Sequence, residues 1–199
     1  TPGSVPCKRV GQLSCNRPSD HKKFNFKGIL PQNSKYATLE GPIEWLIKAG
    51  LIYKVPLCKK AELPLLAYTD ENRFNLFLFD IGILGVMNEL SPQSILNYDY
   101  GSYKGYFAEN FVLMELVAKW HRPFVSWQEN ESQVEFLLDM DDQIFPIEVK
   151  SGKNLRARSL KIFKEKYQPK TLFILSGNLP KKSGATHFLP LYLAALIKS

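Results

Sequence analysis

The pattern of apolar and polar positions first becomes regular near Thr38, where a helix is expected to begin. Thr38 can cap this helix, and Gly50 suits the position just past its last turn. Between these two residues, apolar side chains recur at helical spacing, at Ile43, Leu46 and Ile47. Residues 1–34 come before the helix and are polar, basic and interrupted by prolines, which indicates irregular structure.

Short apolar runs predict a hairpin directly after this helix. Residues 51–55 are expected to form a strand, residues 58–60 a polar turn and residues 65–68 the return strand. A helix that ends in glycine and leads into a hairpin with a basic tip is typical of a winged helix. We therefore assign residues 1–74 to a small winged-helix-like region, with a small α/β subdomain packed on the rest of the chain as the alternative.

Residues 75–199 predict a second domain in which helices and strands alternate. The expected elements are a strand over 75–79, short helices over 81–88 and from 91, a long helix over 103–120, strands over 123–127, 133–140 and 143–150, a basic amphipathic helix over 155–167, and a strand over 171–175. A long helix, three strands, a helix and a strand in this order indicate an α/β fold.

Two of these strands are expected to bring two glutamates together. If Asp141-Asp142 forms a two-residue turn, the resulting register places Glu135 directly opposite Glu148, with side chains about 5 Å apart. Lys150 shares the face of Glu148, because it follows two residues later along the strand. Alternation places Glu135 on one face of its strand and the apolar residues on the other, namely Val134, Phe136, Leu138 and Met140.

This arrangement suggests chemistry on phosphodiesters. Two carboxylates so close together repel each other unless a cation lies between them. A hard divalent ion such as Mg²⁺ or Mn²⁺ takes oxygen ligands and keeps positions for water and phosphate. Lys150 can polarise a water molecule or stabilise the charge that develops on the phosphorus centre. These are the groups that metal-assisted phosphodiester hydrolysis requires.

The helix over 103–120 supplies a third carboxylate. Glu109 begins a stripe of apolar positions that are expected to face the core, namely Val112, Leu113, Leu116 and Trp120. A carboxylate that points toward a sheet needs a partner or a function, because its burial is costly. We therefore predict that Glu109, Glu135 and Glu148 bind the metal and that Lys150 acts with them in catalysis.

The chain resembles the PD-(D/E)xK nuclease superfamily in the order of its predicted elements and in the charged residues that they carry, namely Glu109, Glu135 and the run Ile147-Glu148-Val149-Lys150. More closely, the chain resembles the family of C-terminal domains of unknown function in predicted bacterial AAA+ ATPases. The stretches that carry this resemblance are 41–55, 76–84, 107–112, 134–138 and 146–152. The resemblance implies a restriction-endonuclease-like fold, and it implies nuclease activity less firmly than the fold.

The chain departs from the family in three respects. The acid of the second strand is usually Asp and is Glu135 here, the Pro-Asp that names the superfamily is absent, and no G-x-x-x-x-G-K-[S/T] loop is present. The chain is therefore expected to have no ATP site of its own. We expect it to be the C-terminal part of a longer bacterial protein whose ATPase domain lies upstream.

Charge adds a candidate partner to this picture. The net charge is +7, yet residues 61–150 contain 15 Asp and Glu against 5 Lys and Arg, whereas residues 151–199 contain 10 Lys and Arg and a single acidic residue. The basic segment begins directly after Lys150, where a nucleic-acid backbone would have to lie. Its best candidates for contact with nucleic acid, most simply DNA, are Lys153, Arg156 and Arg158. The remaining cations, Lys161, Lys164 and Lys166, either follow the same backbone or form the solvated face of an amphipathic helix.

Other classes of protein receive little support. No run of about 18 apolar residues is present to span a membrane, and no basic-then-apolar leader is visible. The three cysteines fit no zinc or redox spacing, and we expect reduced thiols in a cytoplasmic protein.

Three functional hypotheses follow from the sequence. The first is a divalent-metal-dependent nuclease that hydrolyses DNA. The second is a catalytically inactive module with the same fold, which binds DNA or docks the ATPase domain or another protein. The third is a purely structural or oligomer-forming domain.

Overall fold

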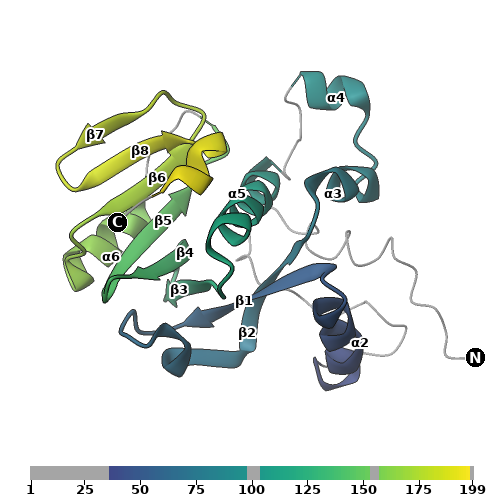
Figure 1. Cartoon of the computed structure of the whole chain (residues 1–199), viewed down its shortest axis with the longest axis horizontal. Coiled ribbons are helices and arrows are strands. Elements are labelled where there is room, and N and C mark those ends of the chain that lie inside the picture. Colours follow the sequence, from purple (N-terminus) through teal and green to yellow (C-terminus); the bar gives the residue numbers. More distant parts are fainter. Residues whose placement is uncertain (1–35, 98–103, 153–156, 198–199) are drawn as a thin grey trace, which may run out of the picture. The chain divides into compact units, whose positions relative to one another are not determined.

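The computed structural model describes residues 36–97, 104–152 and 157–197. The chain divides into two compact units: unit 1 contains residues 1–54 and 75–104, and unit 2 contains residues 55–74 and 105–199 (Figure 1). Each unit therefore takes one segment from each of the two regions that the sequence predicts. The irregular start expected over residues 1–34 lies outside the described residues.

Unit 1 contains the helices α2 (Tyr36–Lys48), α3 (Ile81–Met87) and α4 (Pro92–Leu96). The expected role of Gly50 is confirmed: its φ is +71°, and its N–H donates to the carbonyl of Ile47 at 2.9 Å. The N–H of Leu51 donates to the carbonyl of Leu46 at 3.0 Å, which completes a Schellman motif at the end of α2. Asp80 caps α3 by accepting the N–H of Ile83 at 2.8 Å.

Eight strands form one mixed sheet in the order β2-β1-β3-β4-β5-β6-β8-β7. Their bounds are β1 (Ile52–Cys58), β2 (Thr69–Leu78), β3 (Val125–Glu129), β4 (Ser132–Met140), β5 (Gln143–Val149), β6 (Leu172–Ser176), β7 (Lys181–Ser183) and β8 (Thr186–Pro190). β4 is antiparallel to both β3 and β5, whereas β5, β6 and β8 are parallel to one another. The expected mixed α/β class is confirmed, as are the three successive strands after the long helix.

One predicted strand is wrong. Residues 65–68, expected to be the return strand of the hairpin, form the 3-10 helix η1 (Leu65–Tyr68), and the return strand β2 begins only at Thr69. Leu65 is buried, whereas its neighbour Leu66 is exposed, so one face of a short helical turn rather than one face of a strand packs inward. β1 also pairs in parallel with β3 at Leu57 and Cys58, which makes it an inner strand of the sheet.

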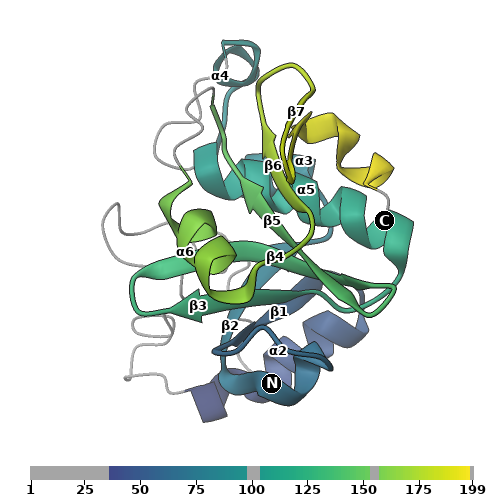
Figure 2. The same ribbon diagram turned by 90° about the vertical axis from the view of Figure 1, so that its left-hand side faces the viewer.

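In unit 2 the long helix α5 (Lys104–Trp120) and the helix α6 (Arg158–Tyr167) cover opposite faces of the sheet, as Figures 1 and 2 show together. Leu160 and Phe163 of α6 pack into a hydrophobic cluster with strand residues that include Val125, Trp127, Val134, Leu137, Leu172 and Ile174. The 3-10 helix η3 (Leu191–Leu196) follows β8. The basic amphipathic helix predicted after Lys150 is thus confirmed from Arg158 onward.

The described residues bear on two expectations, the absence of a membrane-spanning segment and the presence of reduced cysteines. None of the helices there is both long enough and apolar enough to cross a bilayer. Cys58 is a buried free thiol, and its burial raises its pKa to about 12, so this thiol is chemically unreactive near neutral pH.

Candidate functional site

The β4–β5 hairpin has the register that the sequence predicts. Asp141 and Asp142 form the turn with φ values of +50° and +55°, the left-handed conformation that a type I′ turn requires. The facing pairs are Phe136 with Ile147, Leu137 with Pro146, Leu138 with Phe145, Asp139 with Ile144 and Met140 with Gln143. This register directs Glu135, the next residue of β4, toward Glu148 of β5.

A β-bulge interrupts β4 at Glu135. On the β3 side, Val125 faces Leu137 and Trp127 faces Val134, so β4 has one more residue than β3 between these pairs. The hydroxyl of Ser126 donates to the carbonyl of Glu135 at 2.6 Å and holds the bulge in place. The alternation predicted for β4 is therefore wrong at Val134. The prediction placed Val134 on the same face as Phe136, whereas Val134 lies on the face of Leu137 and packs in the hydrophobic cluster that contains Leu160 and Phe163 of α6.

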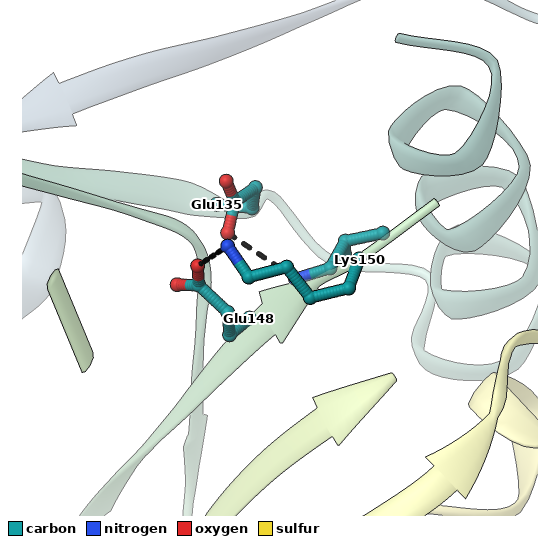
Figure 3. Close-up of polar contacts among 4 residues, drawn as sticks. Glu135, Glu148 and Lys150 are labelled. Carbon is teal, nitrogen blue, oxygen red and sulfur yellow. Dashed lines mark hydrogen bonds and ion pairs between the residues drawn. The ribbon is translucent and has the colours of Figure 1, made fainter. Parts of the chain in front are cut away.

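The bulge leaves Glu135 close to the end of β5. The backbone N–H of Val149 donates to Oε2 of Glu135 at 3.2 Å, so a side-chain oxygen of β4 accepts from the β5 backbone at this point (Figure 3). Glu135 is only 5% exposed and Glu148 only 2%. The sequence prediction that these two carboxylates meet is thereby confirmed.

Lys150 also reaches this cluster, and Figure 3 shows its side chain folded back onto Glu148. Its ammonium lies 2.5 Å from Oε1 of Glu148. The second oxygen of Glu148, Oε2, is buried and has no hydrogen-bond partner among the described residues. A buried carboxylate oxygen without a partner is costly, so this oxygen is favoured to take up a proton or a cation.

The electrostatics of the cluster favour a cation. Burial, and then repulsion from Glu135, raise the pKa of Glu148 to about 8, although Lys150 acts in the opposite direction. Near neutral pH the protein therefore needs either a proton or a further positive charge at Glu148. Lys150 alone does not supply enough positive charge for the two glutamates.

The cluster contains the kinds of ligand atom that a divalent ion takes. Mg²⁺ in proteins is commonly held by one or two carboxylates and keeps several waters for the rest of its octahedron. Glu135 and Glu148 provide two such carboxylates, and Oε2 of Glu148 is an unpartnered ligand atom. The donor set therefore fits a hard divalent ion with water as its other ligands.

The third predicted ligand is placed differently. Glu109 is buried in α5, as its position on the apolar stripe predicts, and its Oε1 lies beside the first turn of its own helix, 3.9 Å from where a side chain on Gly105 would begin. In the part of the chain that the structure describes, no three or more His, Cys, Asp or Glu side chains form a group that could hold a metal. Glu135, Glu148 and Lys150 are brought together there without a third carboxylate.

Two of the predicted nucleic-acid contacts, Lys153 and Arg156, lie outside the described residues. Arg158 is exposed and is the first residue of α6. Sequence reasoning missed Ser126, which fixes the bulge under Glu135. Its signal was a single polar residue in the run Phe124-Val125-Ser126-Trp127, where it is fully buried.

No curated protein and no solved structure matches this chain. Residues 104–193 do match a known family, described as Domain of unknown function (DUF4143). The matched range contains Glu109, Glu135, Glu148, Lys150 and all of α6. The resemblance to a family of domains of unknown function is therefore confirmed for the part of the chain that carries the site.

Proposed function

We propose that unit 2 is a divalent-metal-dependent nuclease domain that hydrolyses phosphodiester bonds in DNA. The observation that carries this proposal is the buried meeting of Glu135 and Glu148 with Lys150 at the end of β5, with Oε2 of Glu148 left unpartnered. A restriction-endonuclease-like arrangement of the sheet and helices is part of the proposal.

Each residue of the cluster has a distinct role in this proposal. Glu135 and Glu148 would hold Mg²⁺ or Mn²⁺, which when bound supplies a Lewis acid and a water of lowered pKa. The N–H of Val149 fixes the orientation of Glu135. Lys150 moves its ammonium from Glu148 to the phosphate and stabilises the negative charge of the transition state. Glu109, the third carboxylate that the sequence predicts as a ligand, remains part of the proposal.

Contact with the substrate would involve the basic segment that follows the site. We propose that Lys153, Arg156 and Arg158 bind phosphates on either side of the bond that is cut, since Lys and Arg near a phosphodiester backbone release counterions and strengthen binding. In a longer parent chain, an ATPase domain upstream would deliver the nucleic acid to this site.

The proposal can be tested by incubating supercoiled and linear DNA with the protein in Mg²⁺ or Mn²⁺, and in EDTA. We expect cleavage only with the metal, and its loss in Glu148→Gln. Glu62→Gln is the matched control, because it removes the same charge from an exposed residue that is not part of the cluster. Cleavage that survives Glu148→Gln would show that this cluster does not perform the reaction.

A second candidate function is a catalytically inactive module of the same fold, which binds DNA or docks the ATPase domain or another partner. Two observations favour it: Lys150 already contacts Glu148, and no third carboxylate joins the cluster among the described residues. A winged-helix-like region over residues 1–74 would then contribute to DNA binding. This candidate predicts salt-sensitive DNA binding without cleavage, and no increase in the melting temperature on addition of Mg²⁺.

A further inference from the structure

We infer that the outer face of α6, formed by Arg158, Lys161 and Lys164, is the surface that binds the phosphate backbone of the nucleic acid; the inference rests on the proposed nuclease function. The three residues are exposed and follow one another at intervals of three along the helix. At 1.5 Å per residue they extend over about 9 Å, a length along which duplex DNA presents several phosphates.

The cations of α6 differ in how far they are neutralised within the protein. Lys166 is tied to Glu129, with its ammonium 2.6 Å from Oε2, and is therefore excluded from the proposed surface. Lys161 lies 3.8 Å from Glu165, but both side chains are largely exposed and such a pair is weak in water. Arg158 and Lys164 form no ion pair with any residue that the structure describes.

The position of α6 links this surface to the glutamate cluster. Glu148 pairs with Ile174 of β6, so the two side chains leave the sheet on the same face. Ile174 packs in the cluster that contains Leu160 and Phe163 of α6. Glu148 therefore lies on the face of the sheet that α6 covers, and Figure 2 shows α6 in front of the sheet beside β4 and β5.

The chemistry of the exposed side chains favours nucleic acid over an anionic membrane. Helices that bind membrane surfaces insert apolar side chains between the lipids. Among the described residues, the large exposed hydrophobic side chains lie on other elements, and those exposed on α6 are charged. This face can follow a chain of phosphates, but it has no apolar anchor for a bilayer.

The test measures binding of a fluorescently labelled DNA duplex by anisotropy, in EDTA and over a series of salt concentrations. We expect Lys161→Ala with Lys164→Ala to reduce the slope of log K against log salt by about 2, because each lost phosphate contact reduces it by about 0.9. The matched control is Lys181→Ala with Lys182→Ala, which removes the same charge from the exposed edge strand β7 and should leave the slope unchanged.

A substitution that makes α6 more positive, rather than less, gives an independent test. Glu165→Gln removes the only acidic side chain of α6 and frees Lys161, so it should tighten DNA binding by a few fold. Circular dichroism of each variant checks that the fold is retained.

The inference is overturned if the two double variants lose the same slope, if the α6 variant binds DNA like the wild type, or if the protein binds phosphatidylserine vesicles and not DNA. Binding in EDTA requires no hydrolysis, so failure of the nuclease proposal would appear separately, as intact binding without cleavage in Mg²⁺.

Discussion

The two ends of the β4–β5 hairpin both carry acidic residues, but they place them in opposite environments. At the turn, Asp141 and Asp142 are exposed to water. At the other end, Glu135 and Glu148 are buried, and one oxygen of Glu148 has no partner among the described residues. Acidic residues alone therefore do not indicate a candidate site, whereas two buried carboxylates that share one ammonium do.

The largest difference between the two ends is expected in catalysis. Glu135→Gln should reduce Mg²⁺-dependent DNA cleavage by at least about a hundredfold, because it removes a ligand for the ion that stabilises the transition state. Asp142→Asn is the matched change at the turn, and it should leave the rate unaltered. Equal rates in the two variants, measured with one DNA substrate, would remove the distinction between the two ends.

The next largest effect concerns stability. At pH 9, where Glu148 is ionised, Lys150→Ala leaves this buried carboxylate without its ion-pair partner and should lower the free energy of unfolding by about 2 kcal/mol. Asp142→Asn should change it by less than about 0.5 kcal/mol, as is usual for an exposed residue. Urea denaturation in the absence of metal measures both values, and a neutral effect of Lys150→Ala would contradict the assigned ion pair.

The pH dependence of stability should show the same contrast. Glu148 has its pKa raised to about 8 in the folded protein, so the folded state holds a proton that the unfolded state releases from about pH 4.5 upward. The contribution of Glu148 to stability should therefore be complete at low pH and be lost as the pH rises through 8.

Melting temperatures from pH 5 to pH 9 without metal test this expectation. They should fall more steeply in the wild type than in Glu148→Gln, which cannot ionise, whereas Asp142→Asn should follow the wild type. Parallel curves for the wild type and Glu148→Gln would contradict the raised pKa.

The smallest expected effect concerns the bulge that sets the buried end apart from the turn. Ser126→Ala removes the hydrogen bond to the carbonyl of Glu135 and should destabilise the fold by about 1 kcal/mol. Ser159→Ala, on α6, serves as the control and should stay within about 0.5 kcal/mol of the wild type. The same stability in both serine variants would show that the bulge holds without Ser126.

Local signals in the sequence are sufficient to predict the register of β4 and β5, which brings Glu135 and Glu148 together. Asp141-Asp142 specifies a tight turn, and a two-residue turn fixes every pair along the hairpin. Gly50 ends α2 for an equally local reason, because its φ is positive.

The features that the sequence did not reveal depend on contacts between distant segments. The bulge in β4 is set by its pairing with β3, and nothing within β4 itself signals the extra residue. Helical periodicity predicts that Glu109 is buried, and the structure confirms this. Its distance from Glu135 and Glu148 depends instead on how α5 packs on the sheet, which periodicity does not specify.

Direct binding of Mn²⁺ tests the central claim, that Glu135 and Glu148 form a divalent-metal site. Titration of the protein followed by electron paramagnetic resonance should show about one tightly bound Mn²⁺ per chain in the wild type and in Asp142→Asn, and none in Glu148→Gln. Equal binding of Mn²⁺ by the wild type and Glu148→Gln, or no binding by the wild type, would contradict the claim.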